Sequence, residues 1–300
     1  MSKERRDVYQ EVTDSLIAAL ETAGEWHRPW QDLGTDIGRP RSIDGRPYRG
    51  TNTLLLWFAA MDHGYEHGIW GTYRAWAAKG AQVRKGERGT MVTLWKPSKR
   101  KARENERADD DGNVSSLFLT HFSVFNAAQV DGWVAPEVPK GPDPIDHAQR
   151  FFAAVGAKVE VRGSRAYYSP GHVDTIVLPN LAAFDTAEHF YATSAHEHTH
   201  WTGHPSRLAR DFSGRFGSEA YAFEELVAEL GAAFVGAHLG IGTVTRQDHA
   251  AYLKSWLKVL RNDKRAVFTA ASKAQAAADY LMKAAGEVET AEEPCEQLAA

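Results

Sequence analysis

Apolar residues recur at helical spacing over long stretches of the second half of the chain. Between residues 218 and 240, Phe223, Leu226, Leu230 and Phe234 follow one another at intervals of three or four and form one apolar stripe. A serine suited to an N-cap precedes this segment and a glycine suited to a helix stop ends it. The pattern predicts a long helix with one buried face.

Other segments show helical or strand-like patterns that together predict an α+β protein. Helix signals cover residues 8–23, 51–63, 72–79, 145–155, 187–202, 246–259 and 268–283. Strand signals, rich in β-branched and aromatic residues, cover residues 89–96, 117–126, 158–162, 165–169 and 173–178. The charged stretch 97–116 between the first two strands is predicted to be a mobile hairpin loop.

The length and the proline distribution indicate two domains. The chain has 300 residues, enough for two units that each bury a core. Four prolines between residues 133 and 144 are typical of a linker. We therefore expect a first domain at residues 1–135, a linker at 136–144, a second domain at 145–286 and a polar tail at 287–300.

Composition narrows the setting in which the protein acts. Its single cysteine, Cys295, excludes a disulfide framework and fits a reducing cytoplasm. The N-terminal segment is charged and amphipathic rather than signal-like, and no apolar run approaches the roughly 20 residues of a membrane span. We expect a cytoplasmic protein that does not use a membrane as a partner.

The sequence His-Glu-His-Thr-His at residues 196–200 carries the clearest chemical signal. Its H-E-x-x-H pattern places the imidazoles of His196 and His200 one helical turn apart, so that one helix presents both to one metal ion. Glu197 beside the first ligand is suited to take a proton from water. Asp185, with Glu188 three residues on, is the predicted N-cap of this helix.

A third metal ligand is expected from a carboxylate on the following helix. The alternative H-x-x-G-x-x-H continuation fails because Ser206 stands at the last position, which leaves His204 as a fallback outside the helix. Glu225 and Glu229 are one turn apart on the 218–240 helix. By likeness to Glu-type zincins, Glu225 would be the ligand and Glu229 would orient a ligating histidine, although Glu229 could replace Glu225.

The same donor set leaves the identity of the metal open. Two histidines and a carboxylate are typical of Zn²⁺ hydrolases, and they also suit manganese, iron or cobalt. We expect Zn²⁺ and keep Mn²⁺ or another divalent transition metal as alternatives.

The first half of the chain is basic and rich in aromatic residues. Residues 28–103 contain 15 Lys and Arg against six Asp and Glu, and six of the nine tryptophans lie between Trp26 and Trp95. A cationic groove lined by flat side chains is how proteins hold single-stranded nucleic acid. Trp57, Trp76 and Trp95 are expected in the core instead. The predicted DNA contacts are Trp30, Arg46, Tyr48, Arg49, Asn52, Trp70, Arg74, Arg84 and Lys85.

Taken together, ordered motifs over about residues 5–285 resemble the ArdC-type antirestriction proteins of conjugative plasmids. The motifs are residues 48–52 (YRGTN), 70–73 (WGTY), 80–87 (GAQVRKGE), 124–126 (VFN) with Gln129, 174–179 (DTIVLP), 196–203 (HEHTHWTG) and 224–230 (EELVAEL). The resemblance implies an N-terminal single-stranded DNA-binding domain, a C-terminal zincin-like metallopeptidase domain and protection of incoming plasmid DNA from host restriction. It also implies metal ligands at His196, His200 and one of Glu225 and Glu229, with Glu197 at the catalytic position.

Two functional hypotheses follow, and they belong to different classes. In the first, the basic half holds single-stranded DNA while the second half, a metallopeptidase, cleaves an unidentified protein, for example one of the host restriction system. Tyr191, His198 and His204 are then candidates for stabilising the oxyanion. In the second, the protein coats DNA without catalysis and its zincin-like domain is a metal-stabilised docking module. A nuclease is disfavoured because such sites usually combine several carboxylates.

Overall fold

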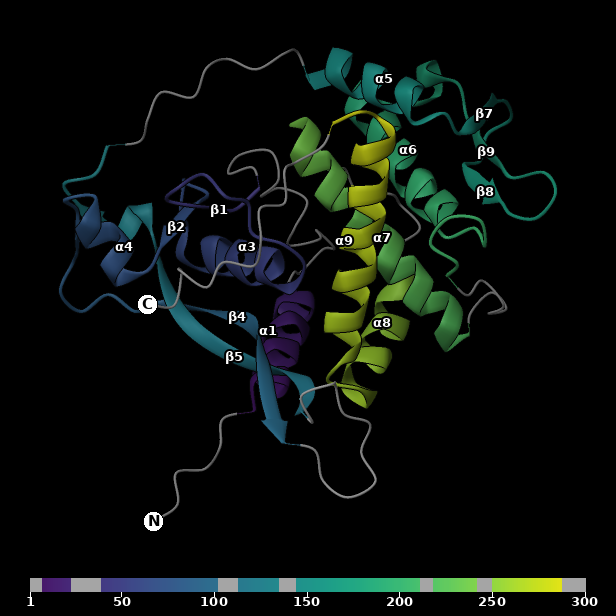
Figure 1. Cartoon of the computed structure of the whole chain (residues 1–300). Helices are drawn as coiled ribbons and strands as arrows, with labels where there is room; N and C mark the ends of the chain where they lie inside the picture. The colour runs from purple at the N-terminus through teal and green to yellow at the C-terminus, as the bar shows by residue number, and fades with distance from the viewer. Residues whose placement is uncertain are drawn as a thin grey trace.

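The computed structural model describes residues 7–22, 39–101, 113–134, 144–210, 218–241 and 250–287, and it combines helices and sheets as expected (Figure 1). The first half contains a four-stranded sheet with the order β1-β2-β5-β4, in which β1 runs parallel to β2 and the other pairs are antiparallel. Two further short strands, β3 and β6, pair antiparallel. The elements of this half are α1 (Val8–Thr22), β1 (Arg41–Ser42), α3 (Thr51–His63), β2 (Ile69–Gly71), α4 (Tyr73–Ala78), β3 (Gln82–Val83), β4 (Thr90–Lys101), β5 (Asn113–Asn126), the 3-10 turn η1 (Ala127–Gln129) and β6 (Val130–Asp131).

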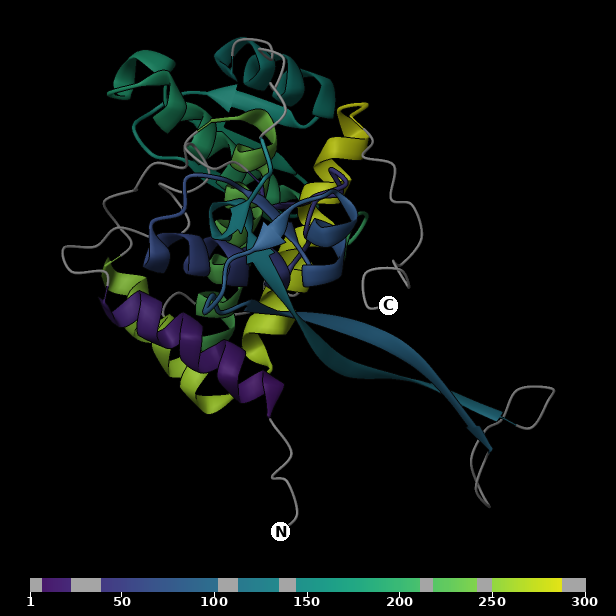
Figure 2. The same cartoon turned by 90° about the vertical axis from the view of Figure 1, so that its left-hand side faces the viewer.

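Strands β4 and β5 form a long two-stranded arm that extends from the body of the molecule (Figure 2). The strands are paired from Thr90 with Val124 out to Lys101 with Asn113. The prediction of a loop from residue 97 to residue 116 was therefore wrong at both ends; residues 102–112 lie outside the described residues. The ladder tolerates Pro97 because β4 is the edge strand of the sheet, where a missing backbone N–H can face solvent.

The second half is a helical bundle with a small three-stranded sheet on one side. In this sheet β9 lies between β7, to which it is parallel, and β8, to which it is antiparallel. Among the described residues, no helix combines the length and apolar content that a membrane span requires. The elements are α5 (Pro144–Val155), β7 (Lys158–Val161), β8 (Tyr167–Ser169), β9 (Thr175–Leu178), the 3-10 turn η2 (Leu181–Ala183), α6 (Ala187–Thr202), α7 (Glu219–Leu239), α8 (Ala250–Asn262) and α9 (Ala266–Ala284).

The largest apolar cluster joins the two halves of the chain. Leu16 of α1 and Trp57 of α3 belong to the same buried cluster as Leu226 of α7, Trp256 of α8 and Ala274 of α9. In Figure 1, α9 (yellow) runs through the centre of the molecule, next to α7 and close to α3. Although smaller clusters lie under the four-stranded sheet and around α4, the main core does not divide at the predicted linker.

Polar contacts also join α9 to the segment that begins α3. Gly50 donates its backbone N–H to the side-chain oxygen of Gln275 (3.1 Å), and Arg49 forms an ion pair with Asp279. Gly50 has a φ of 54°, a left-handed conformation that glycine adopts without strain. This segment is thus part of the contact between the two halves.

Helices α6 and α7 pack closely because a glycine stands where they meet. Helix α6 begins after Thr186, whose hydroxyl accepts the His189 N–H, so the predicted N-cap at Asp185 was one residue early. A Cβ placed on Gly231 of α7 would lie 2.5 Å from Cγ2 and 2.8 Å from Oγ1 of Thr199. Real Cβ atoms do not approach other atoms so closely, and therefore the separation of the two helices depends on the missing side chain.

We expect Gly231→Ala to destabilise the fold by about 1–3 kcal/mol, since overpacking outweighs the better helix propensity of alanine. Chemical denaturation followed by circular dichroism measures the change. Thr199→Ala in the same chain removes both clashing atoms and should restore much of the lost stability. A Gly231→Ala protein as stable as the parent would show that the helices have room to spare.

Candidate metal centre

Two imidazoles and one carboxylate converge between α6 and α7. The Nε2 atoms of His196 and His200 are 3.1 Å apart. Glu225 of α7 places Oε2 at 3.6 Å from Nε2 of His196, and Oε1 at 3.4 Å from Nε2 of His200. Donors held tetrahedrally at the Zn–N and Zn–O bond lengths are about 3.3 Å apart. The spacing and the chemistry of these donors therefore fit one divalent metal ion.

The other side of each imidazole faces a second carboxylate. Oε1 of Glu229 lies 3.0 Å from Nδ1 of His196, and Oε1 of Glu224 lies 3.3 Å from Nδ1 of His200. An acceptor at Nδ1 fixes the proton there and leaves the Nε2 lone pair for a metal. The structure thus places Glu225 with the two Nε2 atoms and Glu229 behind His196, while His204 is outside the group.

An arginine that the sequence analysis missed holds Glu224 in place. The guanidinium of Arg210 donates to both carboxylate oxygens of Glu224 at 3.0–3.2 Å. It also donates to the carbonyl of Thr199 and, at 2.8 Å, to the hydroxyl of Thr202, both near the end of α6. Arg210 therefore compensates a buried carboxylate and satisfies carbonyl groups at the helix end. Arg210 follows an irregular turn after α6, so no helix spacing pattern could reveal it.

The pKa values of the residues in this group are determined by two opposing effects, burial and nearby opposite charges. Burial alone favours neutral His200, but Glu224 and Glu225 outweigh it and raise the pKa of His200 to about 10. Burial likewise opposes ionisation of Glu225, yet the two histidines hold its pKa well below the usual range. The carboxylate is ionised at neutral pH, as a metal ligand must be.

The remaining motif residues divide between the two faces of α6. Glu197 is buried next to the first histidine of the motif. His198 packs its ring 4.6 Å from that of Phe152 on α5 and donates its Nδ1–H to the carbonyl of Ser194, and burial lowers its pKa to about 4. Tyr191 stacks on the same Phe152. His198 and Tyr191 thus contribute to the α5–α6 contact, whereas half-buried His204 bonds to Ser206.

Three of the residues predicted to contact DNA lie inside the fold. Tyr48 and fully buried Trp70 belong to the cluster beneath the four-stranded sheet, so their rings offer no surface for a base in this structure. Asn52 forms a pair of hydrogen bonds with the backbone of Thr93 on β4. These side chains support the sheet, and Trp30 lies outside the described residues.

Five other predicted contacts are cations with exposed side chains. Arg46, Arg74 and Lys85 are exposed on the first half. Arg49 pairs with Asp279, and Arg84 pairs with Glu87 while also reaching the carbonyl of Ala128. A role for any of them in DNA binding stays a prediction.

The exposed aromatic residues of this half differ from those that the sequence suggested. Trp57 and Trp76 are fully buried as expected. Trp95 was expected in the core but is 46% exposed on β4, where its ring lies edge-on to that of Tyr9 on α1. Tyr73 and Phe118 are about half exposed. The basic half therefore does present aromatic side chains on its surface, but at positions other than the predicted Tyr48 and Trp70.

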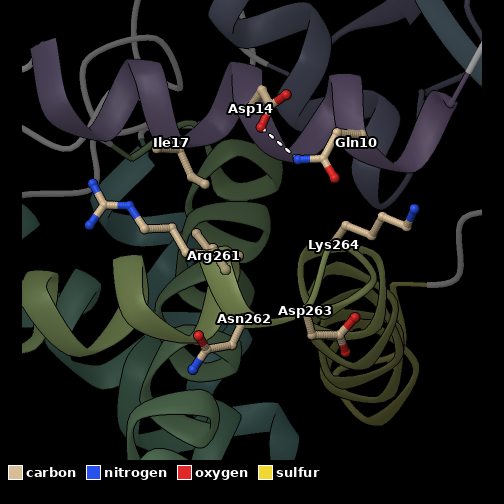
Figure 3. A pocket seen from close by; sticks show the side chains of 8 residues that line it. Gln10, Asp14, Ile17, Arg261, Asn262, Asp263 and Lys264 are labelled. Carbon is tan, nitrogen blue, oxygen red and sulfur yellow. Dashed lines mark hydrogen bonds between the residues drawn. The ribbon is translucent and has the colours of Figure 1, made fainter.

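A pocket beside the turn between α8 and α9 does not contribute to this centre. It lies between α1 and the turn that joins α8 to α9, and its lining is mostly polar (Figure 3). Within it Gln10 donates to Asp14 of the same helix at 2.9 Å. None of the histidines or carboxylates of the α6–α7 group lines the pocket.

Comparisons with known proteins agree with this geometry. Residues 146–273 match a family described as zincin-like metallopeptidase, and residues 6–125 match the N-terminal domain of the anti-restriction factor ArdC. The crystal structure of the antirestriction protein ArdC from the R388 plasmid is 40% identical, covers 95% of this chain and all of its own, and superposes with a TM-score of 0.79 in its metal-free form. The chain belongs to the ArdC antirestriction family.

Other known proteins are also similar to this chain. The Mn(II)-bound structure of R388 ArdC superposes with a TM-score of 0.76. An uncharacterised Sinorhizobium fredii protein, y4eC, is 46% identical, over 92% of this chain and 91% of its own length. The DNA primase TraC of Escherichia coli is 36% identical over 94% of this chain, but the match spans only 28% of the primase.

We expect Glu229→Gln to weaken binding of Zn²⁺ or Mn²⁺ by 10- to 100-fold, because the acceptor behind His196 loses its charge. Competition with a chelator measures the affinity. Glu219→Gln, an exposed position on the same helix, should bind as the parent does. Equal affinity in all three proteins would show that Glu229 has no part in orienting the ligand.

Proposed function

We propose that this protein binds single-stranded DNA and protects incoming conjugative plasmid DNA from host restriction with the help of a metal-dependent peptidase. The observation that carries the proposal is the convergence of His196, His200 and Glu225, in a chain whose family is antirestriction. The setting is the cytoplasm of the cell that receives the DNA.

His196, His200 and Glu225 would hold the metal, and Glu229 and Glu224 would orient the two imidazoles. We propose Zn²⁺ from this donor set, with Mn²⁺ as the alternative, since the R388 relative is described with Mn(II) bound. A divalent ion in this position supplies Lewis-acid polarisation of water and of a peptide carbonyl.

The chain itself supplies the proton transfer. Glu197 is buried and adjacent to a ligand, which is where a general base acting on the attacking water is needed. Its carboxylate would accept the proton of that water and return it to the leaving amine. Burial strengthens these charge interactions because little bulk water competes for the same groups.

Glu197→Gln tests catalysis. We expect peptide cleavage to fall by about 10²- to 10⁴-fold, because amide nitrogen cannot accept the proton, while the metal content and the fold stay unchanged. Mass spectrometry of a random peptide library incubated with the protein measures peptide cleavage. Plasma mass spectrometry of the purified protein measures its metal content.

The same variant decides whether cleavage serves antirestriction. We expect transfer of an unmodified plasmid into a restricting recipient to drop to the level seen without the protein, whereas Glu188→Gln, in the first turn of the same helix, should protect normally. Full protection by Glu197→Gln would instead favour the alternative function, a DNA-coating protein whose zincin-like part is a metal-stabilised docking module.

The DNA-binding part of the proposal rests on exposed cations and rings of the basic half. Arg46, Arg74 and Lys85 are exposed and Tyr73 and Trp95 offer accessible rings, which supplies phosphate contacts and stacking surfaces. The full chain is the right reagent, because α1 and α3 share their core with the second half.

Replacing Arg46, Arg74 and Lys85 together by alanine should weaken binding to a single-stranded oligonucleotide and flatten its salt dependence by up to about two units, at roughly 0.7 unit per lost phosphate contact. Fluorescence anisotropy at several salt concentrations measures both. Alanine at Arg165, Lys258 and Lys283 removes the same charge from the second half and should change little. The opposite ranking of the two triple variants would place the DNA elsewhere.

A further inference from the structure

A second group of metal-ligating side chains lies at one end of the helical bundle. His147 of α5, His238 of α7 and Glu287, three residues beyond α9, place one ligand atom each within 4.8 Å of the others. Glu287 bridges the histidines, with Oε1 at 2.8 Å from Nε2 of His147 and Oε2 at 2.6 Å from Nε2 of His238. Figure 1 shows the C-terminal end of α9 beside α5.

The backbone after α9 is built so that Glu287 reaches this position. The N–H of Glu287 donates to the carbonyl of Met282 (2.8 Å), and that of Gly286 to the carbonyl of Lys283 (3.1 Å). With a φ of 78° at Gly286, these bonds form a Schellman motif. The residue after the glycine in this motif is commonly apolar and packs back on the helix. Here it is a carboxylate aimed at two imidazoles.

This group is separate from the α6–α7 centre. His238 follows Glu225 on α7 by more than three turns, which corresponds to about 20 Å along the helix axis. The two groups share no ligand, and a change in one leaves the donors of the other in place.

The local field favours a cation. His238 is in the last turn of α7, and Glu287 follows the C-terminal end of α9, so two helix ends with partial negative charge lie near the group. The N-terminal end of α5 opposes this, although Asp146 is in its first turn. Burial works against ionisation of Glu287, but His238 and His147 hold its pKa below the usual value, so the carboxylate is charged at neutral pH.

We propose that His147, His238 and Glu287 form a second, structural site for a divalent transition metal, with Zn²⁺ as the ion that this donor set fits best. Two imidazole nitrogens and a carboxylate oxygen are three ligands of a tetrahedral ion, and water completes the shell because the side chains are 15–31% exposed. The donors, now at hydrogen-bonding distances of 2.8 and 2.6 Å, need to separate by about 0.5–0.7 Å to reach the spacing around zinc.

A metal here would tie three helices together at one end of the bundle. Helix α7 carries Glu225 and Glu229, and α5 packs against α6, so both walls of the α6–α7 centre would be fixed at their far ends. The site contributes stability in the presence of zinc and takes no part in peptide cleavage.

Zinc stoichiometry of the untagged full chain tests the proposal. In a His196→Ala/His200→Ala background, equilibrium dialysis against zinc chloride should leave one zinc per chain, and zinc should raise the melting temperature. Adding Glu287→Gln should abolish both effects. Because glutamine can still hydrogen-bond to both imidazoles, it separates a metal site from a hydrogen-bonded bridge. Adding His172→Ala, an exposed histidine, should preserve both effects.

The proposal is overturned if the background variant binds no zinc, or if Glu287→Gln and His147→Gln each retain the full amount. Should the background variant fail to fold, the comparison is made in the parent chain, where Glu287→Gln should lower the zinc content from two to one. Loss of the other ion, or of neither, contradicts the assignment.

Discussion

The close approach of α6 and α7 is the constraint on which the centre depends. His196 and His200 lie one turn apart on α6 and face Glu225 on α7, so an extra ångström between the two helix axes would separate the histidines from Glu225. The approach is possible because Gly231 offers no side chain to Thr199. A single small residue thus sets the distance between the two histidines and Glu225 without being a ligand itself.

That proximity brings several charges into a buried space, and each is matched by an opposite group. Glu224, Glu225 and Glu229 are almost completely buried on one stretch of helix, which would be strongly unfavourable for isolated carboxylates. Glu224 faces both Arg210 and His200, while Glu225 and Glu229 face the two sides of His196. Without the histidines the carboxylates would repel one another, and without Glu224 and Glu225 burial would favour the neutral form of His200.

The sequence predicted the parts of the site that lie on regular helices. The spacing of His196, Glu197 and His200, and the one-turn offset of Glu225 and Glu229, translate directly into positions on helix faces. Arg210 could not be found this way, since it follows an irregular turn. The spacing pattern gave no role to Glu224, because its contact with His200 depends on the angle between two helices.

The basic half was harder to predict because a tryptophan is equally suited to core and surface. Trp70 and Trp95 each follow an aliphatic residue, yet Trp70 is fully buried and Trp95 is 46% exposed on the arm. Arg49, one of the predicted DNA contacts, forms an ion pair with Asp279 of α9 in this structure. The strands of the arm were predicted, whereas their length was not, because the backbone pairing of β4 and β5 continues through a charged segment that carries no strand-like pattern.

The shared core has a consequence for how the protein unfolds. Although the chain matches two families along its length, its largest apolar cluster takes side chains from α1 and α3 together with α7, α8 and α9. Unfolding of either half would expose the apolar surface that the other half buries against it. We therefore expect the two halves to unfold in one cooperative transition. The boundary between the two family matches therefore does not separate two independently folding units. Neither half can be exchanged without also redesigning the apolar surface that it leaves exposed on the other half.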